Sequence, residues 1–404
     1  MKILVLNAGS SSQKACLYEI GSAIPEDAPQ PQWDGKIEVD GDSAEVRVQN
    51  SRGHRAQETV RVEPRSASVG ELLVKLWSDK SRSVGAPRAV DVVAHRIVNG
   101  GPDFRDPVLI TPEVKAAIAR ASSFAPLHNA SGLAGIEFAE KRFGGVLQVA
   151  VFDTGFHKTL PDAAYVYPGP YEWIAQGIRR FGFHGINHQY CAERAAKLLG
   201  KGGSLRLVIC HLGNGCSLAA VRDGRSVDTT MGFTPLDGLM MGTRSGSIDP
   251  GILTYLMSQG FTASQLDELL NKKSGLLGIS GISGDMRDIV REMKSGNLRA
   301  KLAFDIFVHR LRASIGAMVA ALGGIDALVF TAGIGENSPE VRAAACGHCD
   351  YLNIELENDK NATVSDDQDI ARAGSAVRVL VLHAQEDWAI AKEAWKIMSD
   401  GDSR

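Results

Sequence analysis

Long apolar runs are missing from this sequence, and so is a surplus of charge of either sign. No apolar run reaches the roughly 18 to 20 residues that a membrane-spanning helix needs. The 44 lysines and arginines are nearly balanced by 47 aspartates and glutamates, for a net charge of −3, so the chain lacks the basic surface that binds nucleic acid or anionic lipid. We therefore expect neither a membrane nor a nucleic acid among its partners.

Cysteine is scarce as well, with six residues in 404. Cys16 and Cys210 lie in apolar segments, which suits reduced thiols, and the pair Cys346 and Cys349 has no second pair at metal-ligand spacing. The apolar segment 1–6 is too short for a signal peptide. These observations predict a cytoplasmic protein and argue against a zinc site.

Glycine, by contrast, is abundant, with 43 residues, as expected of a protein with several tight ligand loops. The hydrophobic share of 44% and the charged share of 23% are ordinary for a globular protein. Because 404 residues exceed one typical core, we expect two domains.

The most informative segment is 211–250. It follows the apolar run 205–210, which predicts a buried strand, so Gly213 and Gly215 fall where that strand turns back. Backbone N–H groups in such a turn can cradle phosphate oxygens. Arg244 stands in a loop of small residues, where its guanidinium suits bidentate contact with a phosphoryl group or a carboxylate. The alternative is an ordinary hairpin with a surface arginine.

A segment near the N-terminus echoes this pattern. Residues 3–20 predict a strand, a glycine-serine turn and a second strand, without the spacing of a Walker-type loop. Gly9 follows its apolar run as Gly213 follows 208–210, half a chain later. The echo predicts a duplicated architecture with a cleft between the halves.

Three further segments place charged or polar side chains beside predicted buried elements. Strand 90–98 contains Arg96, which is costly to bury unless it meets an anion, a structural salt bridge being the alternative. Strand 146–152 ends at Asp153, a candidate for metal binding or acid–base work, because strand ends over a crevice hold ligand groups in α/β proteins. Segment 179–188 carries two arginines and two histidines and leads into a helix that we expect Asn187 to cap.

The rest of the pattern alternates helices and strands and therefore predicts an α/β protein. For residues 21–88 we expect edge strands and loops followed by a helix near 69–78. One further helix is expected to begin at 112, and a second helix is expected to end at 142. Other helices are expected at 262–273 and 298–322, and further strands at 325–330 and 377–382. The glycine-rich turn 331–337, between a strand and a helix, is a ready anion or nucleotide site, and loop 281–287 enters another helix.

These motifs together resemble those of the acetokinase family, within the wider actin-like and sugar-kinase superfamily, over nearly the whole chain. The segments that carry the resemblance are 7–12 (NAGSSS), 183–185 (FHG), 211–215 (HLGNG), 238–246 (GLMMGTRSG) and 331–337 (TAGIGEN). The resemblance implies an α/β fold of two actin-like (ribonuclease H-like) domains with a nucleotide cleft between them, formed by 1–153 plus 386–404 and by 154–385. It also implies acetate kinase activity: reversible, Mg²⁺-dependent transfer of the γ-phosphoryl group of ATP to acetate, giving acetyl phosphate and ADP, in a homodimer, with Mn²⁺ as an alternative metal.

Carried over position by position, the resemblance implies a role for each matching residue. The catalytic residues would be Asp153, His184 and Arg244, and the metal-associated pair would be Asn7 and Glu386. Arg96 would hold the acetate carboxylate, and the apolar pocket for its methyl group would comprise Val98, Leu127, Phe183 and Pro235. The nucleotide-contacting residues would be Lys14, His211, Leu212, Gly213, Asn214, Gly215, Asp285, Met286, Arg287, Gly333, Ile334, Gly335, Glu336 and Asn337.

The chemistry of this reaction agrees with such a set of residues. Acetate is already ionised at pH 7, so no strong base is needed to create the nucleophile. The difficulty is to bring a carboxylate to a polyanionic phosphate, which cations relieve by stabilising charge in a loose, in-line transition state. Asp153 is then expected to position metal or substrate and not to remove a proton.

The chain departs from the family pattern in two places, and two alternative functions compete. Where the family has Thr-Ser after His-Gly this chain has Ile186-Asn187, and its 383–387 reads HAQED in place of PTNEE. The first alternative is a kinase for propionate or a longer acid. Val98 favours acetate, because a smaller residue there would admit propionate. The second is an actin-like switch that hydrolyses ATP, which would leave Arg96 without a purpose.

Overall fold

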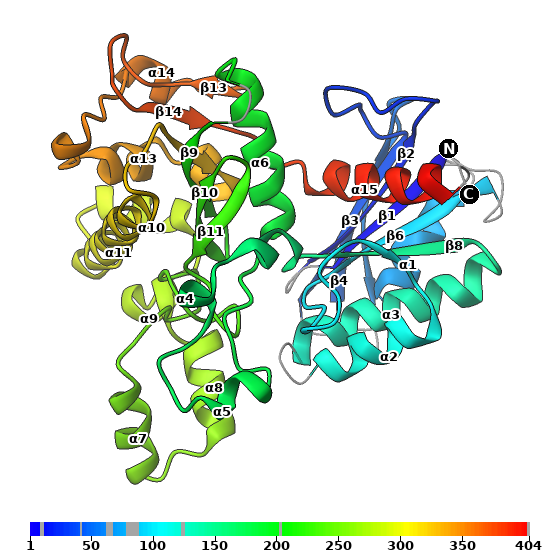
Figure 1. Cartoon of the computed structure of the whole chain (residues 1–404), viewed down its shortest axis with the longest axis horizontal. Helices are drawn as coiled ribbons and strands as arrows, with labels where there is room; N and C mark the ends of the chain where they lie inside the picture. Colours follow the sequence, from blue (N-terminus) through cyan, green and yellow to red (C-terminus); the bar gives the residue numbers. More distant parts are fainter. Residues whose placement is uncertain are drawn as a thin grey trace. The chain divides into compact units, whose positions relative to one another are not determined.

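The computed structural model describes residues 1–8, 12–40, 43–61, 68–77, 89–122, 126–201 and 204–401. Gly9, Ser10 and Ser11, at the centre of the first motif, lie outside these ranges. The chain divides into two compact units, Met1–Gly155 with Gln385–Arg404, and Phe156–Ala384. Each unit is built on its own β-sheet with helices against it (Figure 1). Within the described ranges, no helix combines the length and apolar character that crossing a bilayer requires.

The first unit contains an eight-stranded sheet in the order β5-β4-β3-β2-β1-β6-β8-β7. Strands β1, β6 and β8 run parallel to one another, and the other neighbouring pairs are antiparallel. The strands are β1 (Lys2–Ala8), β2 (Ser12–Glu19), β3 (Trp33–Asp40), β4 (Ser43–Asn50), β5 (Arg55–Arg61), β6 (Val92–Ile97), β7 (Val108–Leu109) and β8 (Leu147–Phe152). Within 21–88 we expected edge strands, and β3, β4 and β5 instead extend the sheet as an antiparallel meander with β5 at its edge.

The alternation of side chains along β1 decides what covers each face of this sheet. Leu4 and Leu6 belong to the core beneath α1 (Ser68–Val74) and α3 (Pro126–Phe143), to which Phe143 also contributes. The opposite face is covered by the C-terminal helix α15 (Glu386–Gly401), whose Trp388 ring lies 5.6 Å from that of Tyr18. Figure 1 shows α15 (red) and α3 on opposite sides of the sheet. The helix α2 (Pro112–Ala121) packs on α3 and begins, as predicted, with Thr111 as its N-cap.

The second unit contains a six-stranded sheet in the order β11-β10-β9-β12-β14-β13, in which β9, β12 and β14 are parallel. The strands are β9 (Arg206–Leu212), β10 (Cys216–Arg222), β11 (Arg225–Thr229), β12 (Ala327–Thr331), β13 (Gln368–Asp369) and β14 (Arg378–Val381). The helices α6 (Gly185–Leu198) and α11 (Leu298–Leu322) cover its two faces (Figure 1). The bounds of α11 are those predicted from its long apolar pattern.

The second unit also contains a set of shorter helices. They are α4 (Asp162–Tyr165), α5 (Glu172–Ala175), α7 (Pro250–Ser258), α8 (Ala263–Lys272), α9 (Gly275–Ser280), α10 (Met286–Lys294), α12 (Ala332–Asn337), α13 (Pro339–Cys346) and α14 (Asn358–Ala362). The predicted capping box of α8 is present between Thr262 and Gln265.

The start of α6 differs from our expectation, because Asn187 does not cap it. The helix begins at Gly185, and His184 is its N-cap, with φ 57° and ψ 23°. The backbone has already reversed through positive φ at Gly182 and His184, so the helix starts before Asn187 is reached. Asn187 is instead fully buried within the first turn, and its amide serves another residue, as described below.

Candidate active site

In the first unit, two residues from neighbouring parallel strands form a buried ion pair. Nη2 of Arg96, on β6, donates to Oδ2 of Asp153, just beyond β8, across 2.8 Å, and the two side chains are 11% and 1% exposed. Burial by itself would lower the pKa of Arg96, but the charges of Asp153 and Glu386 outweigh it and raise that pKa. The guanidinium therefore keeps its charge in a site that excludes most water.

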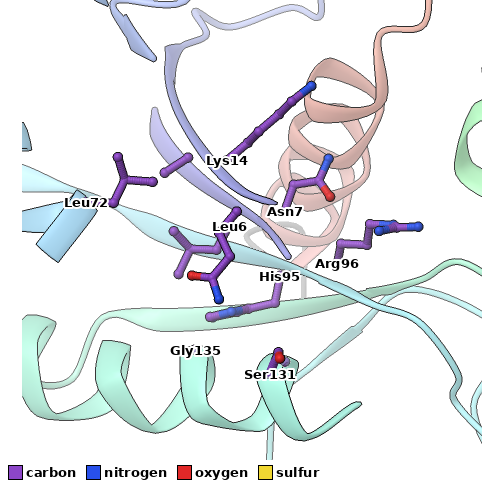
Figure 2. A pocket seen from close by; sticks show the side chains of 11 residues that line it. Leu6, Asn7, Lys14, Leu72, His95, Arg96, Ser131 and Gly135 are labelled. Atoms are coloured by element: carbon purple, nitrogen blue, oxygen red, sulfur yellow. The ribbon is translucent and has the colours of Figure 1, made fainter. Parts of the chain in front are cut away.

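A second polar group lies where β1 ends and α15 begins. Nδ2 of Asn7 is 2.7 Å from Oδ1 of Asp387 and 3.4 Å from Oε2 of Glu386. Figure 2 shows Asn7 and Arg96 leaving neighbouring strands near α15, while His95 points to the opposite face, toward α3. Asp387 was not among our candidate residues. Its position next to Glu386 at the start of a helix was the only signal in the sequence.

The oxygen-rich character of this group bears on the metal that the resemblance implies. Mg²⁺ takes oxygen ligands and is usually held by one or two carboxylates together with substrate phosphates and water. The carboxylates of Glu386 and Asp387 and the amide of Asn7 fit that requirement. Among the described residues, no cluster of three His, Cys, Asp or Glu side chains offers a site that the protein alone would complete.

Two other candidate residues of the first unit lie nearby. Lys14 is exposed on β2, directly across from Asn7 in the antiparallel pair. Val98 is buried at the end of β6, with 4% of its surface exposed. The side chain of Leu127 lies outside the described residues.

In the second unit, a hairpin turn brings the two remaining catalytic candidates together. Gly213 and Gly215 form the turn between β9 and β10, as predicted, although β9 runs on through His211 and Leu212. A Cβ at Gly215 would lie 3.4 Å from Nε2 of His184 and 3.5 Å from Nη1 of Arg244. The glycine thus leaves room beside both an imidazole and a guanidinium, which is the arrangement that stabilises negative charge.

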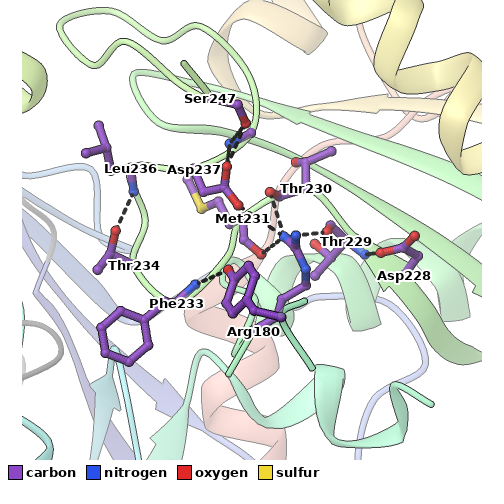
Figure 3. A network of polar contacts seen from close by, with 12 residues as sticks. Arg180, Asp228, Thr229, Thr230, Met231, Phe233, Thr234, Leu236, Asp237 and Ser247 are labelled. Carbon is purple, nitrogen blue, oxygen red and sulfur yellow. Dashed lines mark hydrogen bonds and ion pairs between the residues drawn. The ribbon is translucent and has the colours of Figure 1, made fainter. Parts of the chain in front are cut away.

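Arg180 holds the loop 229–235, which contacts Arg244, by hydrogen bonds to its backbone. Nη1 of Arg180 donates to the carbonyls of Thr229, Thr230 and Met231 at 3.1, 3.0 and 2.9 Å (Figure 3). Farther along the same loop, the carbonyl of Pro235 accepts a hydrogen bond from Nη1 of Arg244 at 3.2 Å. Arg180 was grouped in the sequence with the functional cluster 179–188, and the structure gives it the role of holding this loop. Phe183, which precedes His184, is 1% exposed.

A pocket of about 720 Å³ adjoins the same hairpin turn. This volume is in the range of sites for small molecules and cofactors. Of the predicted nucleotide-contacting residues, the pocket is lined by Gly213, Asn214, Asp285, Met286, Arg287, Gly333, Ile334 and Asn337. It is also lined by four residues that we did not predict: Gly284, Val290, Ser338 and Glu340.

The other predicted nucleotide residues of this unit support the pocket and do not line it. Leu212 is fully buried, and Gly335 packs against the backbone of Phe330. Oε1 of Glu336 accepts from the backbone N–H of Ala384 at 2.9 Å. Gly215 faces His184 and Arg244, and His211 stacks on His184 with ring centroids 3.9 Å apart.

A buried arginine that the sequence analysis missed holds the glycine-rich segment in place. Arg342, on α13, is 1% exposed, and its Nη1 donates to the carbonyls of Gly335 and Glu336 at 2.8 and 2.7 Å. These carbonyls belong to α12 and would otherwise lack partners at its C-terminal end. Because Arg342 lies in an ordinary helical pattern, nothing in the sequence marked it.

Comparison with known proteins places the chain among relatives that match it from end to end. The model of the Acetokinase family matches residues 2–392. The chain is 56% identical to an acetate kinase of Cyanothece sp. (strain PCC 7425) over 402 residues, covering 98% of both chains. A crystal structure of Porphyromonas gingivalis acetate kinase superposes with a TM-score of 0.88 at 38% identity, covering 98% of this chain and 99% of that one. A propionate kinase from Francisella tularensis superposes with a TM-score of 0.87 at 36% identity, covering 97% and 98%. The expected two-domain, actin-like α/β fold is confirmed by these matches.

Proposed function

The chain belongs to the acetokinase family, and we propose that its two units divide the work of phosphoryl transfer between acceptor and donor. The reaction is that of an acetate kinase: the γ-phosphoryl group of ATP passes to acetate and yields acetyl phosphate and ADP. In our proposal the first unit supplies the groups for the acceptor carboxylate and the metal. The second unit supplies the nucleotide pocket and the groups that act on the transferring phosphoryl.

Arg96 is the proposed partner of the acetate carboxylate. Its guanidinium has several donors in a fixed fork, so it can bind a carboxylate while one Nη stays with Asp153. Asp153 has no proton to remove from acetate, which is ionised at neutral pH. Its proposed role is to orient Arg96 and to keep the local charge balanced until the phosphate arrives.

His184 and Arg244 are proposed to stabilise the phosphoryl group in transfer. They flank Gly215, on the turn whose other residues line the nucleotide pocket, and this placement is the observation that carries the proposal. In a loose transition state the charge spreads over the three equatorial oxygens, and preorganised donors beside those oxygens lower the barrier. Reversal of the reaction requires the same groups, because forward and reverse reactions share one transition state.

Mg²⁺ is the metal that we propose for Glu386, Asp387 and Asn7, with Mn²⁺ as the alternative. When bound, such an ion neutralises phosphate charge and helps to orient the nucleotide. The protein's own part is to present two adjacent carboxylates at the start of α15, beside the amide of Asn7.

Acyl phosphate formation tests this function directly. The assay traps acyl phosphate with hydroxylamine while ADP release is followed, with ATP, Mg²⁺ and either acetate, propionate, butyrate or no carboxylate. We expect acetate to give the highest kcat/KM and propionate to follow, since one methylene in an apolar pocket changes specificity by about 10- to 200-fold. A preference for propionate would make the chain a propionate kinase. ADP release that ignores every carboxylate would support a nucleotide switch instead.

We also propose that the protein forms a homodimer through the exposed surface of helix α7. This helix has no buried residue, and Ile252, Tyr255 and Met257 are 44%, 64% and 55% exposed. Apolar side chains gathered on one exposed helix are typical of an interface. Sedimentation should show a dimer that Tyr255→Glu weakens and Tyr351→Glu, at an exposed tyrosine elsewhere in the unit, does not. A monomeric wild-type protein would refute the dimer.

A further inference from the structure

A buried serine lies between two histidines behind the hairpin turn. Oγ of Ser217, on β10, is 2.9 Å from Nδ1 of His184 and 2.8 Å from Nε2 of His188, and Ser217 and His188 are fully buried. A serine hydroxyl has one hydrogen to donate and lone pairs to accept. It can donate to one of these imidazoles only, so the other must donate to it.

His188 determines the direction of this chain of hydrogen bonds. Its complete burial lowers its pKa well below the ordinary value, so its ring is neutral and carries one N–H. Among the residues that the structure describes, no group lies within hydrogen-bonding distance of Nδ1 of His188. A buried N–H without an acceptor is costly, so the proton belongs on Nε2, where Ser217 accepts it.

We propose that His188 and Ser217 are positioning residues that hold His184 in the tautomer with its proton on Nε2. His188 donates to Ser217, and Ser217 then donates to Nδ1 of His184. Since Nδ1 of His184 is occupied as an acceptor, its N–H lies at Nε2. That atom is 3.4 Å from the position that a Cβ on Gly215 would take. The inference deepens the proposed function, because it states how His184 presents a hydrogen to the phosphoryl group.

His211 is held in the same tautomer by a different residue. Nδ2 of Asn187 lies 2.8 Å from Nδ1 of His211, and an amide N–H₂ can only donate, so this ring also carries its proton on Nε2. Nε2 of His211 is 3.7 Å from the position of a Cβ on Gly213. The two rings stack nearly parallel, 14° apart, and present two N–H donors to the same glycine turn. Asn187 is one of the residues at which the chain departs from the family pattern, and this contact gives it a role.

The position of these protons can be measured without turnover. The probe is the full-length protein with ¹⁵N-labelled histidine, examined by two-bond ¹H–¹⁵N correlation, which distinguishes protonated from unprotonated ring nitrogens. His184→Gln identifies the His184 signals by their loss. We expect Nδ1 of His184 to be unprotonated and Nε2 to be protonated in the wild-type protein. A protonated Nδ1 with an unprotonated Nε2 would overturn the proposal, whatever the enzyme's activity.

Ser217→Ala removes the donor to His184 and tests the chain of hydrogen bonds. We expect the His184 signals to shift toward the other tautomer and kcat for acyl phosphate to fall about 10- to 100-fold, as for the loss of one buried hydrogen bond. Ser217→Thr, which keeps the hydroxyl, should retain the wild-type pattern. Ser226→Ala is the matched control, because Ser226 is equally buried and bonds Nδ1 of His157 at 2.8 Å. It should leave the His184 signals in place.

The outcomes separate this inference from the proposed function. An unchanged His184 spectrum in Ser217→Ala would overturn the proposed chain of hydrogen bonds from His188 through Ser217 to His184, even if the protein is an active acetate kinase. If Ser217→Ala does not fold, the wild-type spectrum still decides the tautomer. If the wild-type protein shows His184 protonated on Nε2 but forms no acyl phosphate, the proposed hydrogen bonds are supported and the proposed function is refuted.

Discussion

Asn7 and Asp387 are 380 positions apart in the sequence, yet Nδ2 of Asn7 donates to Oδ1 of Asp387 across 2.7 Å. The same amide is 3.4 Å from Glu386, the residue that the resemblance marked as a metal ligand. The contact joins the first strand of the chain to its last helix. It also places a second carboxylate in the proposed metal site.

Removal of Asp387 should therefore raise the metal requirement of the enzyme. For Asp387→Ala we expect the Mg²⁺ concentration at half-maximal activity to rise about tenfold, comparable with Glu386→Ala, because each change removes one carboxylate from a hard cation's site. The measurement is a Mg²⁺ titration of acyl phosphate formation at saturating ATP. Glu393→Ala, farther along α15, is the control. An unchanged titration in Asp387→Ala would exclude this carboxylate from the site.

Arg96 and Asp153 should be strongly coupled in stability. Arg96→Ala deprives a carboxylate that is 1% exposed of the cation that neutralises it, which costs about 3–5 kcal/mol in the free energy of unfolding. Arg96→Ala/Asp153→Ala should recover a large part of that loss. A double-mutant cycle in urea measures the coupling. Additive effects of the two single changes would show that the pair acts as two independent charges.

Gly215→Ala should impair catalysis with little effect on folding. The added Cβ would meet His184 and Arg244 at 3.4 and 3.5 Å, which are ordinary van der Waals distances, so the protein should fold. The methyl group would nevertheless occupy the space proposed for a phosphoryl oxygen. We expect kcat to fall at least about tenfold with an unchanged Tm. Gly21→Ala, where a Cβ meets nothing within 4 Å, is the control for the substitution itself. Full activity in Gly215→Ala would show that the phosphoryl group does not occupy the space beside Gly215.

His95 should make stability depend on pH. Burial lowers its pKa from 6.5 to about 4, against the opposing effect of its hydrogen bond to Gln148. The unfolded chain therefore binds more protons between pH 6.5 and 4, so this contribution is complete above pH 6.5 and falls as pH is lowered through that window, by roughly 3 kcal/mol in total. Urea unfolding at pH 5 and pH 7 should show a smaller difference in His95→Gln than in the wild type. Equal differences would contradict the assignment.

Several features of the fold and of the candidate site could be predicted from the sequence, because each depends on a short local pattern of residues. The turn at Gly213 and Gly215 follows an apolar strand, and the bounds of α11 follow from its apolar periodicity. The position of Asp153, directly after a buried strand, was predicted as well. In each instance a few neighbouring residues contain the whole signal.

What could not be anticipated depends on contacts between distant segments. Asn187 has the side chain of a helix cap, but the backbone turn at His184 starts the helix earlier and leaves the amide to His211. Arg342 looks like any helical arginine until its partners, the carbonyls of Gly335 and Glu336, are known. Neither assignment can be made from sequence spacing, because each depends on which elements pack together.

In the proposed mechanism, Arg244 acts on the transferring phosphoryl group and not on the binding of ATP. The most direct test is the steady-state kinetics of Arg244→Ala with acetate and ATP, with Arg291→Ala, at an exposed arginine of α10, as the control. We expect kcat to fall by about 10³ or more while KM for ATP changes little, as for a group that contacts only the transition state. A large rise in KM for ATP with kcat intact would show that Arg244 binds the nucleotide, and it would contradict the mechanism proposed for this site.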